Sequence, residues 1–299
     1  MRGTAAERKL DVPAERVSPS LRLLARSWRE VQRRPLGAVS LATVLLLLTV
    51  SAAAPLIATH APTDIDVYQK WRPPSSTHLL GTDSLGRDVW SRLVWGGRIS
   101  LAVGFGAAFI GTTVGALIGL ISGFLLGRVD LVVQRVVDGV QSIPALISAL
   151  AFVYALGPSW ITLSLAIGVP ILAIAARVMR STTVVLREEV YVEAARALGG
   201  SDAYVVTRHI APNSVAPYMV LLTAHIAWAI VIEASLGFLG LGIPPPTPTW
   251  GGMLVGAQKE LLFAPWTVIV PGTVITVAAL AFNLAGDAIR DSFDPRLQQ

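Results

Sequence analysis

Long uncharged stretches alternate with short charged ones along most of the chain. Five uncharged runs are long enough to cross a bilayer, which takes about 20 mostly apolar residues. They cover residues 35–59, 99–127, 139–176, 209–232 and 261–286, with the histidines of the fourth counted as neutral. The third run would reach about 57 Å as one helix, nearly twice the ~30 Å hydrocarbon core. Because the Gly-Pro-Ser-Trp sequence at 157–160 can break it, the pattern predicts an all-α membrane protein with six transmembrane helices.

Composition supports a lipid-embedded chain. Of the 299 residues, 53% are hydrophobic and only 14% are charged, against roughly 25% charged in an ordinary soluble domain. The chain contains no cysteine, which excludes disulfides, thiolate metal ligands and cysteine nucleophiles.

The distribution of Lys and Arg predicts the orientation. With both termini in the cytoplasm, 18 of the 24 Lys and Arg residues fall on the cytoplasmic side, as the positive-inside rule requires. The net charge of +5 then belongs to the membrane surface, and we expect no nucleic-acid partner. The predicted parts are a basic cytoplasmic tail (1–34), a first transmembrane helix (35–59), an extracytoplasmic loop (60–98), a core of five transmembrane helices (99–286) that includes a cytoplasmic loop (188–212), and a cytoplasmic tail (287–299).

The common catalytic motifs are absent. None of the three lysines follows a glycine, so the chain lacks the Gly-Lys-Ser/Thr end of a phosphate-binding P-loop. No His-Glu-x-x-His zinc pattern and no Gly-x-Ser-x-Gly nucleophile elbow occurs either. We therefore expect no catalytic residue, no metal ligand and no cofactor bound by this chain.

Glu233 is the one clear acid inside a predicted span, in the outer part of the fifth. An intramembrane acid is a functional candidate by default, for example in ion coupling. The alternative is a carboxyl group near the outer interface, capped by hydroxyl or backbone donors or packed against a partner helix. The lack of a basic partner favours this second interpretation.

Two further patterns concern helices. Glycines recur every four residues along the second run, which predicts a helix face that another helix can approach closely, from this chain or from a second subunit; they are Gly111, Gly115, Gly119, Gly123 and Gly127. Within the first long loop, residues 87–95 can form a short amphipathic interfacial helix, with Val89, Trp90 and Leu93 against the membrane.

The cytoplasmic loop 188–212 predicts two short helices around a tight turn. In the first helix Tyr191, Ala194, Ala195 and Leu198 share an apolar face, while Glu189, Glu193 and Arg196 share the other. Gly199 and Gly200 can end this helix in a left-handed turn, and Ser201 with Asp202 can start the second as N-cap and first-turn acid. Such an element could transmit force from a soluble protein to the membrane helices, or could simply lie on the headgroups.

These motifs resemble a known family. The sequence EAARALG at 193–199, followed nine residues later by HIAP at 209–212, is similar to the EAA loop of permease subunits in ATP-binding-cassette (ABC) importers. Residues 81–101, 128–147 and 235–254 resemble the C-type permease of dipeptide, oligopeptide and nickel uptake systems. Ala211 departs from the family pattern, which has Leu before the proline.

The resemblance implies a type I importer permease fold with cytoplasmic coupling helices, in the cell membrane. The expected partners are a homologous second permease, two ATPase subunits or a fused ATPase that bind ATP and Mg²⁺, and an extracytoplasmic substrate-binding protein. The expected cargo is a dipeptide or oligopeptide, with nickel chelates and related solutes left open. By the same resemblance, contact with the ATPase falls to Glu193, Ala194, Ala195, Arg196, Leu198, Gly199, Ser201, Asp202 and Tyr204.

Two other classes of protein are weighed against this one. A stand-alone secondary carrier should show internal repeats and several intramembrane ionisable residues, of which Glu233 is at most one. A membrane enzyme should show a catalytic cluster, and the sequence has none. The importer permease is therefore the leading hypothesis, with the carrier as its alternative.

Overall fold

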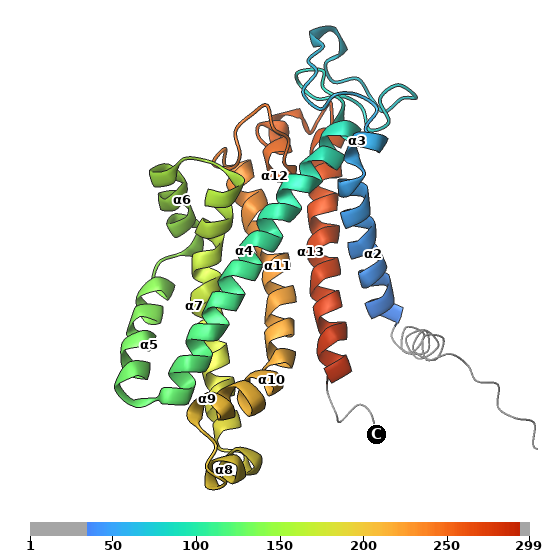
Figure 1. The fold of residues 1–299 in the computed structure, drawn as a ribbon. Helices are drawn as coiled ribbons and strands as arrows, with labels where there is room; N and C mark the ends of the chain where they lie inside the picture. The colour runs from blue at the N-terminus through green and yellow to red at the C-terminus, as the bar shows by residue number, and fades with distance from the viewer. Residues whose placement is uncertain (1–34, 294–299) are drawn as a thin grey trace, which may run out of the picture.

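The computed structural model describes residues 35–293, and this part of the chain is an elongated bundle of helices (Figure 1). The helices are α2 (Pro35–Ala52), α3 (Ala54–Ile57), α4 (Val89–Leu125), α5 (Gly127–Gln141), α6 (Ala145–Leu156), α7 (Trp160–Arg187), α8 (Val190–Ala197), α9 (Asp202–Val205), α10 (Ala211–Asn213), α11 (Val215–Phe238), α12 (Trp250–Met253) and α13 (Trp266–Phe293). Short 3-10 helices at Val67–Gln69 and Ala257–Glu260 and a π-helix at Val206–Ile210 complete the order. We call the lower end of Figure 1 the α8 end and the upper one the α12 end.

Among the described residues, five helices are long and apolar enough to cross a membrane: α2, α4, α7, α11 and α13. The pair α5 and α6 gives a sixth candidate, but the two helices are bent by 86° at their break. The span predicted to begin at residue 139 is therefore a bent pair of helices that begins earlier, at Gly127. Pro144 lies at the break directly before α6, where it lacks the N–H that a continuous helix needs and disfavours helical backbone in the residue before it.

The predicted interfacial helix at 87–95 is also wrong as a separate element. Asp88 caps α4 by accepting a hydrogen bond from the Ser91 N–H, and the helix then continues without interruption for 37 residues. Val89 and Leu93 are buried inside the protein. Gly96 and Gly97 lie inside this helix and allow close contact with Thr249, Trp250 and Ser51.

Several helix boundaries differ from the ends of the apolar runs that predicted them. α7 continues to Arg187 and α13 to Phe293, so the predicted tail from residue 287 begins inside a helix. α11 begins at Val215, later than residue 209, because the π-helical turn precedes it. The basic tail 1–34 and residues 294–299 lie outside the described part of the chain.

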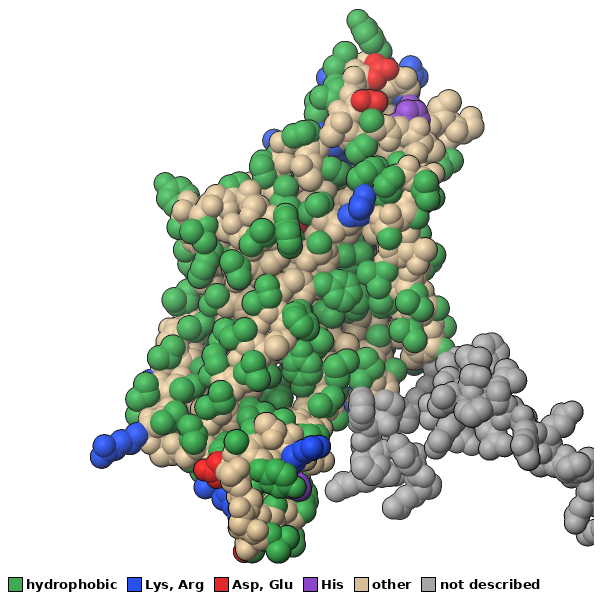
Figure 2. Space-filling view, in the orientation of Figure 1, with side chains coloured by type: hydrophobic (Ala, Val, Ile, Leu, Met, Phe, Trp, Pro, Cys, Tyr) green, Lys and Arg blue, Asp and Glu red, His purple; other side chains and the backbone are tan. Residues whose placement is uncertain are grey.

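The core lies where α4 crosses α7, α11 and α13 (Figure 1). Figure 2 shows hydrophobic side chains over the middle of the visible face, with charged side chains mainly toward the two ends. Large apolar side chains such as Leu46 on α2 and Phe109 on α4 are exposed. This distribution is the one expected of a multi-pass membrane protein, whose flanks contact lipid or other membrane subunits.

The glycine row on α4 packs against α7 of the same chain. A Cβ atom added at each glycine would lie too close to a carbonyl oxygen of α7. The distances are 2.5 Å for Gly111 to Gly168, 2.3 Å for Gly115 to Leu172, 2.3 Å for Gly119 to Ala176 and 2.7 Å for Gly123 to Arg180. Backbone thus meets backbone along four successive turns. Gly127 does not belong to this contact: it has a φ of +60°, begins α5 and has open space where a Cβ would be.

Candidate functional site

The predicted helix, turn and second helix are confirmed at the α8 end (Figure 1). Gly199 has a φ of +83°, and its N–H donates to the Arg196 carbonyl at 2.9 Å while the Gly200 N–H donates to the Ala195 carbonyl at 3.0 Å. These two bonds form a Schellman motif, in which glycine takes the left-handed position. Ser201 then caps α9 by accepting a hydrogen bond from the Tyr204 N–H. Gly200 has no positive φ; it is needed for space, since a Cβ there would lie 2.7 Å from the Ala195 oxygen.

The face of α8 that packs on the bundle differs from the predicted apolar face. Val192 is fully buried with Phe124, Val205 and Ile210, and the Arg196 guanidinium lies 5.2 Å from the centre of the Phe124 ring. Arg196 was expected to share the solvent face with Glu193, and this is wrong. A guanidinium group can stack on an aromatic ring while its methylene stem packs against apolar neighbours, and periodicity does not reveal such a contact.

The predicted apolar face is instead largely open to the surroundings. Tyr191 is 39% exposed and Leu198 is 89% exposed. Together with α9 these residues line a groove of about 690 Å³, whose lining is Tyr191, Ala194, Ala195, Leu198, Gly199, Gly200, Ser201, Tyr204 and His209. Of the predicted contact residues, Glu193 and Asp202 are exposed outside this groove, and Arg196 faces the bundle. An exposed apolar groove of this kind is typical of a protein-interaction site.

His209 also lines the groove, although it was not among the predicted ATPase contacts: it ends the predicted loop 188–212 and also begins the apolar run 209–232. Its ring lies 6.1 Å from that of Tyr191 and 5.5 Å from that of Tyr204. The π-helix places it there, and π-turns are frequent at functional sites. The sequence positions of Tyr191, Tyr204 and His209 do not predict this cluster, because the three residues belong to α8, α9 and the π-helix.

The groove is connected to three long helices. Phe124, at the end of α4, contacts Arg196 of α8, and its carbonyl accepts a hydrogen bond from Arg187 of α7 at 2.9 Å. The π-helix and α10, which Ala211 begins, lead from α9 into α11. α8 therefore contacts the end of α4, which is bonded to α7, and is connected along the chain to α11.

Glu233 is completely buried on α11 toward the α12 end. The hydroxyl groups of Ser100 and Thr249 interact with its carboxyl group, although neither carboxyl oxygen has a partner at normal hydrogen-bond geometry. No Lys or Arg of residues 35–293 forms an ion pair with it. The structure thus shows a packed acid without a capping hydrogen bond, and the role of Glu233 stays a prediction.

The fold matches a transporter of known structure. The chain superposes on the crystal structure of an amino acid ABC transporter with a TM-score of 0.51, covering 68% of this chain and 94% of that one at 17% identity. The chain therefore shares the all-α fold of that transporter, with membrane-length helices and a short exposed helix pair at one end.

Sequence comparison identifies the family. Residues 115–299 match the model of the binding-protein-dependent transport system inner membrane component, and residues 22–74 match the N-terminal transmembrane domain of oligopeptide transport permease C. The chain belongs to this family of inner membrane transport components. It is a multi-pass permease subunit that works with other transporter subunits, which confirms the resemblance and argues against a stand-alone carrier.

Relatives extend over most of the chain. A putative peptide transport system permease protein of Brucella suis is 38% identical, over 90% of this chain and 91% of the relative. A dipeptide transport system permease protein of Alkalihalophilus pseudofirmus is 37% identical, over 91% and 90%. A glutathione transport system permease protein of Pectobacterium atrosepticum is 36% identical, over 91% and 90%.

Proposed function

We propose that this permease carries a dipeptide or oligopeptide into the cell and is driven by ATP hydrolysis in separate subunits that dock on the α8–α9 groove. The exposed groove around Leu198 carries the proposal, because an exposed apolar surface rimmed by polar residues is typical of an interaction site. The names of the relatives support a peptide-like cargo.

The proposed complex contains a homologous second permease, two ATPase subunits or one fused ATPase, and an extracytoplasmic substrate-binding protein. This chain is its non-catalytic part, and ATP with Mg²⁺ binds to the ATPase. The absence of a glycine-lysine pair anywhere in the sequence supports this division of labour, because a P-loop uses that lysine to hold phosphates.

Coupling would follow the contacts at Phe124. Closure of the ATPase dimer would push on α8, and the buried contacts of Val192 and Arg196 with Phe124 would pass the movement to α4. The Arg187 hydrogen bond to the Phe124 carbonyl would include α7 in the same movement. The helices would then reorient around a cargo pathway shared with the second permease.

We expect Leu198→Glu to weaken ATPase binding by about 100-fold or more. Burial of a leucine side chain contributes about 1.5–3 kcal/mol, each 1.4 kcal/mol corresponds to about tenfold in affinity, and a glutamate would add the cost of burying a charge. Binding of the purified ATPase to the permease pair in nanodiscs measures the affinity, and peptide uptake by proteoliposomes should fall with it.

Leu262→Glu is the matched control for this exchange. Leu262 is 97% exposed but lies at the α12 end, so the control should leave ATPase binding unchanged. Equal thermal stability of the two variants would show that both fold. Wild-type ATPase affinity in Leu198→Glu would contradict the proposed docking surface.

The proposed orientation places the α8 end in the cytoplasm. It is supported by Arg177, Arg180, Arg187, Arg196 and Arg208, which lie in the segment around this end. A reporter that is active only in the cytoplasm should therefore work when fused after residue 299 and fail when inserted into the loop at residues 73–77. The reverse pattern would overturn the orientation.

A further inference from the structure

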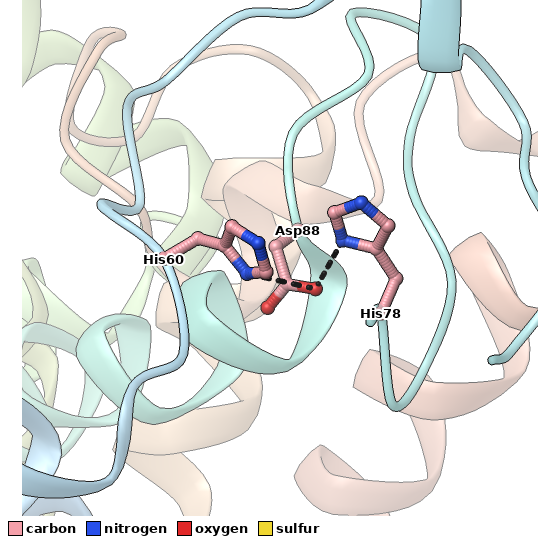
Figure 3. Close-up of side chains that lie close together, drawn as sticks. All are labelled: His60, His78 and Asp88. Atoms are coloured by element: carbon pink, nitrogen blue, oxygen red, sulfur yellow. Dashed lines mark hydrogen bonds and ion pairs between the residues drawn. The ribbon is translucent and has the colours of Figure 1, made fainter. Parts of the chain in front are cut away.

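Two histidines and one aspartate meet at the α12 end, far from the groove (Figures 1 and 3). His60 follows α3, His78 lies in the loop that precedes α4, and Asp88 is the N-cap of α4. Each residue can offer one ligand atom, and these atoms all lie within 4.8 Å of one another. Three separate segments thus bring nitrogen and oxygen donors to a single point.

All three side chains have hydrogen-bond partners: His60 Nδ1 lies 3.0 Å from the Thr59 hydroxyl, and other neighbouring groups orient His78 and Asp88. The Gln69 amide donates to Asp66 Oδ2 at 3.1 Å, so its carbonyl oxygen faces His78 Nε2, also at 3.1 Å. His78 Nε2 therefore donates to Gln69. Nδ1 is hydrogen-bonded to Asp88 Oδ1 at 2.9 Å, and a metal ion would replace the proton between these two atoms. This arrangement, in which the outer nitrogen of a histidine donates to an oxygen, is the usual one for a metal-binding histidine.

Asp88 is oriented in the same way. Its Oδ2 accepts hydrogen bonds from the Ser91 N–H at 2.8 Å and from the Thr59 hydroxyl at 3.2 Å. The other oxygen, Oδ1, faces His78 Nδ1 at 2.9 Å and His60 Nδ1 at 3.9 Å. His78 and Asp88 are both buried, so neighbouring groups restrict their side chains.

The separations are close to those of a metal site. Bonds of about 2.0–2.1 Å in a tetrahedral zinc site place neighbouring ligand atoms about 3.3 Å apart. The two His–Asp separations of 2.9 and 3.9 Å lie on either side of this value, while the set as a whole extends to 4.8 Å. The His60 ring stacks on the His78 ring with centres 4.6 Å apart, so it must turn to direct a nitrogen at the same ion. Its side chain is 39% exposed and has the room to turn.

We propose that His60, His78 and Asp88 bind one divalent transition-metal ion of the zinc type, with water as the remaining ligand. Two imidazoles and one carboxylate suit Zn²⁺, whereas Mg²⁺ and Ca²⁺ prefer sites made only of oxygen. The ion would join the end of α3, the loop and the start of α4. The ligands lie 18 and 10 residues apart in the sequence, a spacing that no short zinc motif contains.

The test uses the full chain without a polyhistidine tag, purified in detergent. Competition with a chromophoric zinc chelator should show one Zn²⁺ per chain, with millimolar Mg²⁺ unable to displace it. His60→Ala should weaken binding by about 100-fold or more, because it removes a ligand, and loss of an outer-shell partner alone costs about 10–100-fold; the His78–Asp88 contact stays in place. His209→Ala removes another of the four histidines at the opposite end and should bind zinc as the wild type does.

Asp88→Asn gives a second, independent variant. Asparagine caps a helix as well as aspartate does, so α4 should still begin at Val89 while the charged ligand is lost and zinc binding falls. Zinc should also raise the thermal midpoint of the wild type and of His209→Ala, but not of His60→Ala. Unchanged zinc affinity in His60→Ala, or no stoichiometric zinc binding by the wild type, would overturn the proposal and leave the cluster as a hydrogen-bonded ion pair.

Discussion

A Gly119→Ala exchange should destabilise this permease, although alanine is the better helix former. The new Cβ would lie 2.3 Å from the Ala176 carbonyl oxygen and 2.8 Å from the Arg180 nitrogen. Both are backbone atoms of α7, so the contact can relax only if α4 and α7 move apart. We expect a cost of about 1–3 kcal/mol for alanine, and almost no folded protein for Gly119→Leu. Thermal unfolding followed by size-exclusion chromatography in detergent measures both.

Gly139→Ala is the matched control for this prediction. Gly139 also lies inside a helix, α5, but nothing stands within 4 Å of its ideal Cβ position. Alanine there should stabilise the protein by about 0.5–1 kcal/mol, because it reduces the conformational entropy that glycine loses on folding. The two exchanges should therefore have opposite signs. A stabilising effect of Gly119→Ala would contradict the close contact between α4 and α7.

Gly199→Val should abolish most peptide uptake while leaving the amount of inserted permease unchanged. The φ of +83° at Gly199 is strained for any residue with a β-carbon, and most of all for a β-branched one. Nothing stands within 4 Å of the ideal Cβ position, so crowding plays no part. A turn forced out of its left-handed conformation would displace Leu198 and Tyr204 relative to each other. Because a strain of about 1–2 kcal/mol corresponds to about 10-fold, we expect uptake to fall by roughly tenfold or more, measured in proteoliposomes together with ATP hydrolysis.

Two controls separate the turn from a general glycine effect. Asparagine tolerates the left-handed region, so Gly199→Asn should keep most of the uptake. Gly256 has a φ of +73° and equally open surroundings, but it lies at the α12 end; Gly256→Val should leave uptake coupled to ATP hydrolysis. Wild-type transport by Gly199→Val would show that the turn does not transmit the ATPase movement.

Much of the fold could be predicted because lipid imposes simple rules on sequence. Long apolar runs had to be helices, and the positions of α2, α4, α7, α11 and α13 follow from them. The errors concern helix ends and a bend, which apolar runs do not predict. Charge does not end a helix, so α7 and α13 continue past their apolar runs. The 86° bend before α6 lies at one proline inside a run that is uncharged throughout.

The candidate site was predicted in part for the same reason. Local signals such as a glycine in a left-handed turn and a serine N-cap act within a few residues, and the turn at Gly199 and the cap at Ser201 are as expected. Arg196 and His209 depend on contacts with residues distant in the chain or in other elements, Phe124 for the first and Tyr191 for the second. Helical periodicity cannot show which of two faces finds such a partner.

The length of α4 has a mechanical consequence. Its 37 residues extend about 55 Å, so one unbroken rod joins the cluster at Asp88 to the contact at Phe124. A rotation of this rod by about 5° around its midpoint would shift each end by about 2.4 Å, in opposite directions. A small push on Phe124 therefore reaches the far side of the membrane as a movement comparable to the separation of two hydrogen-bonded atoms.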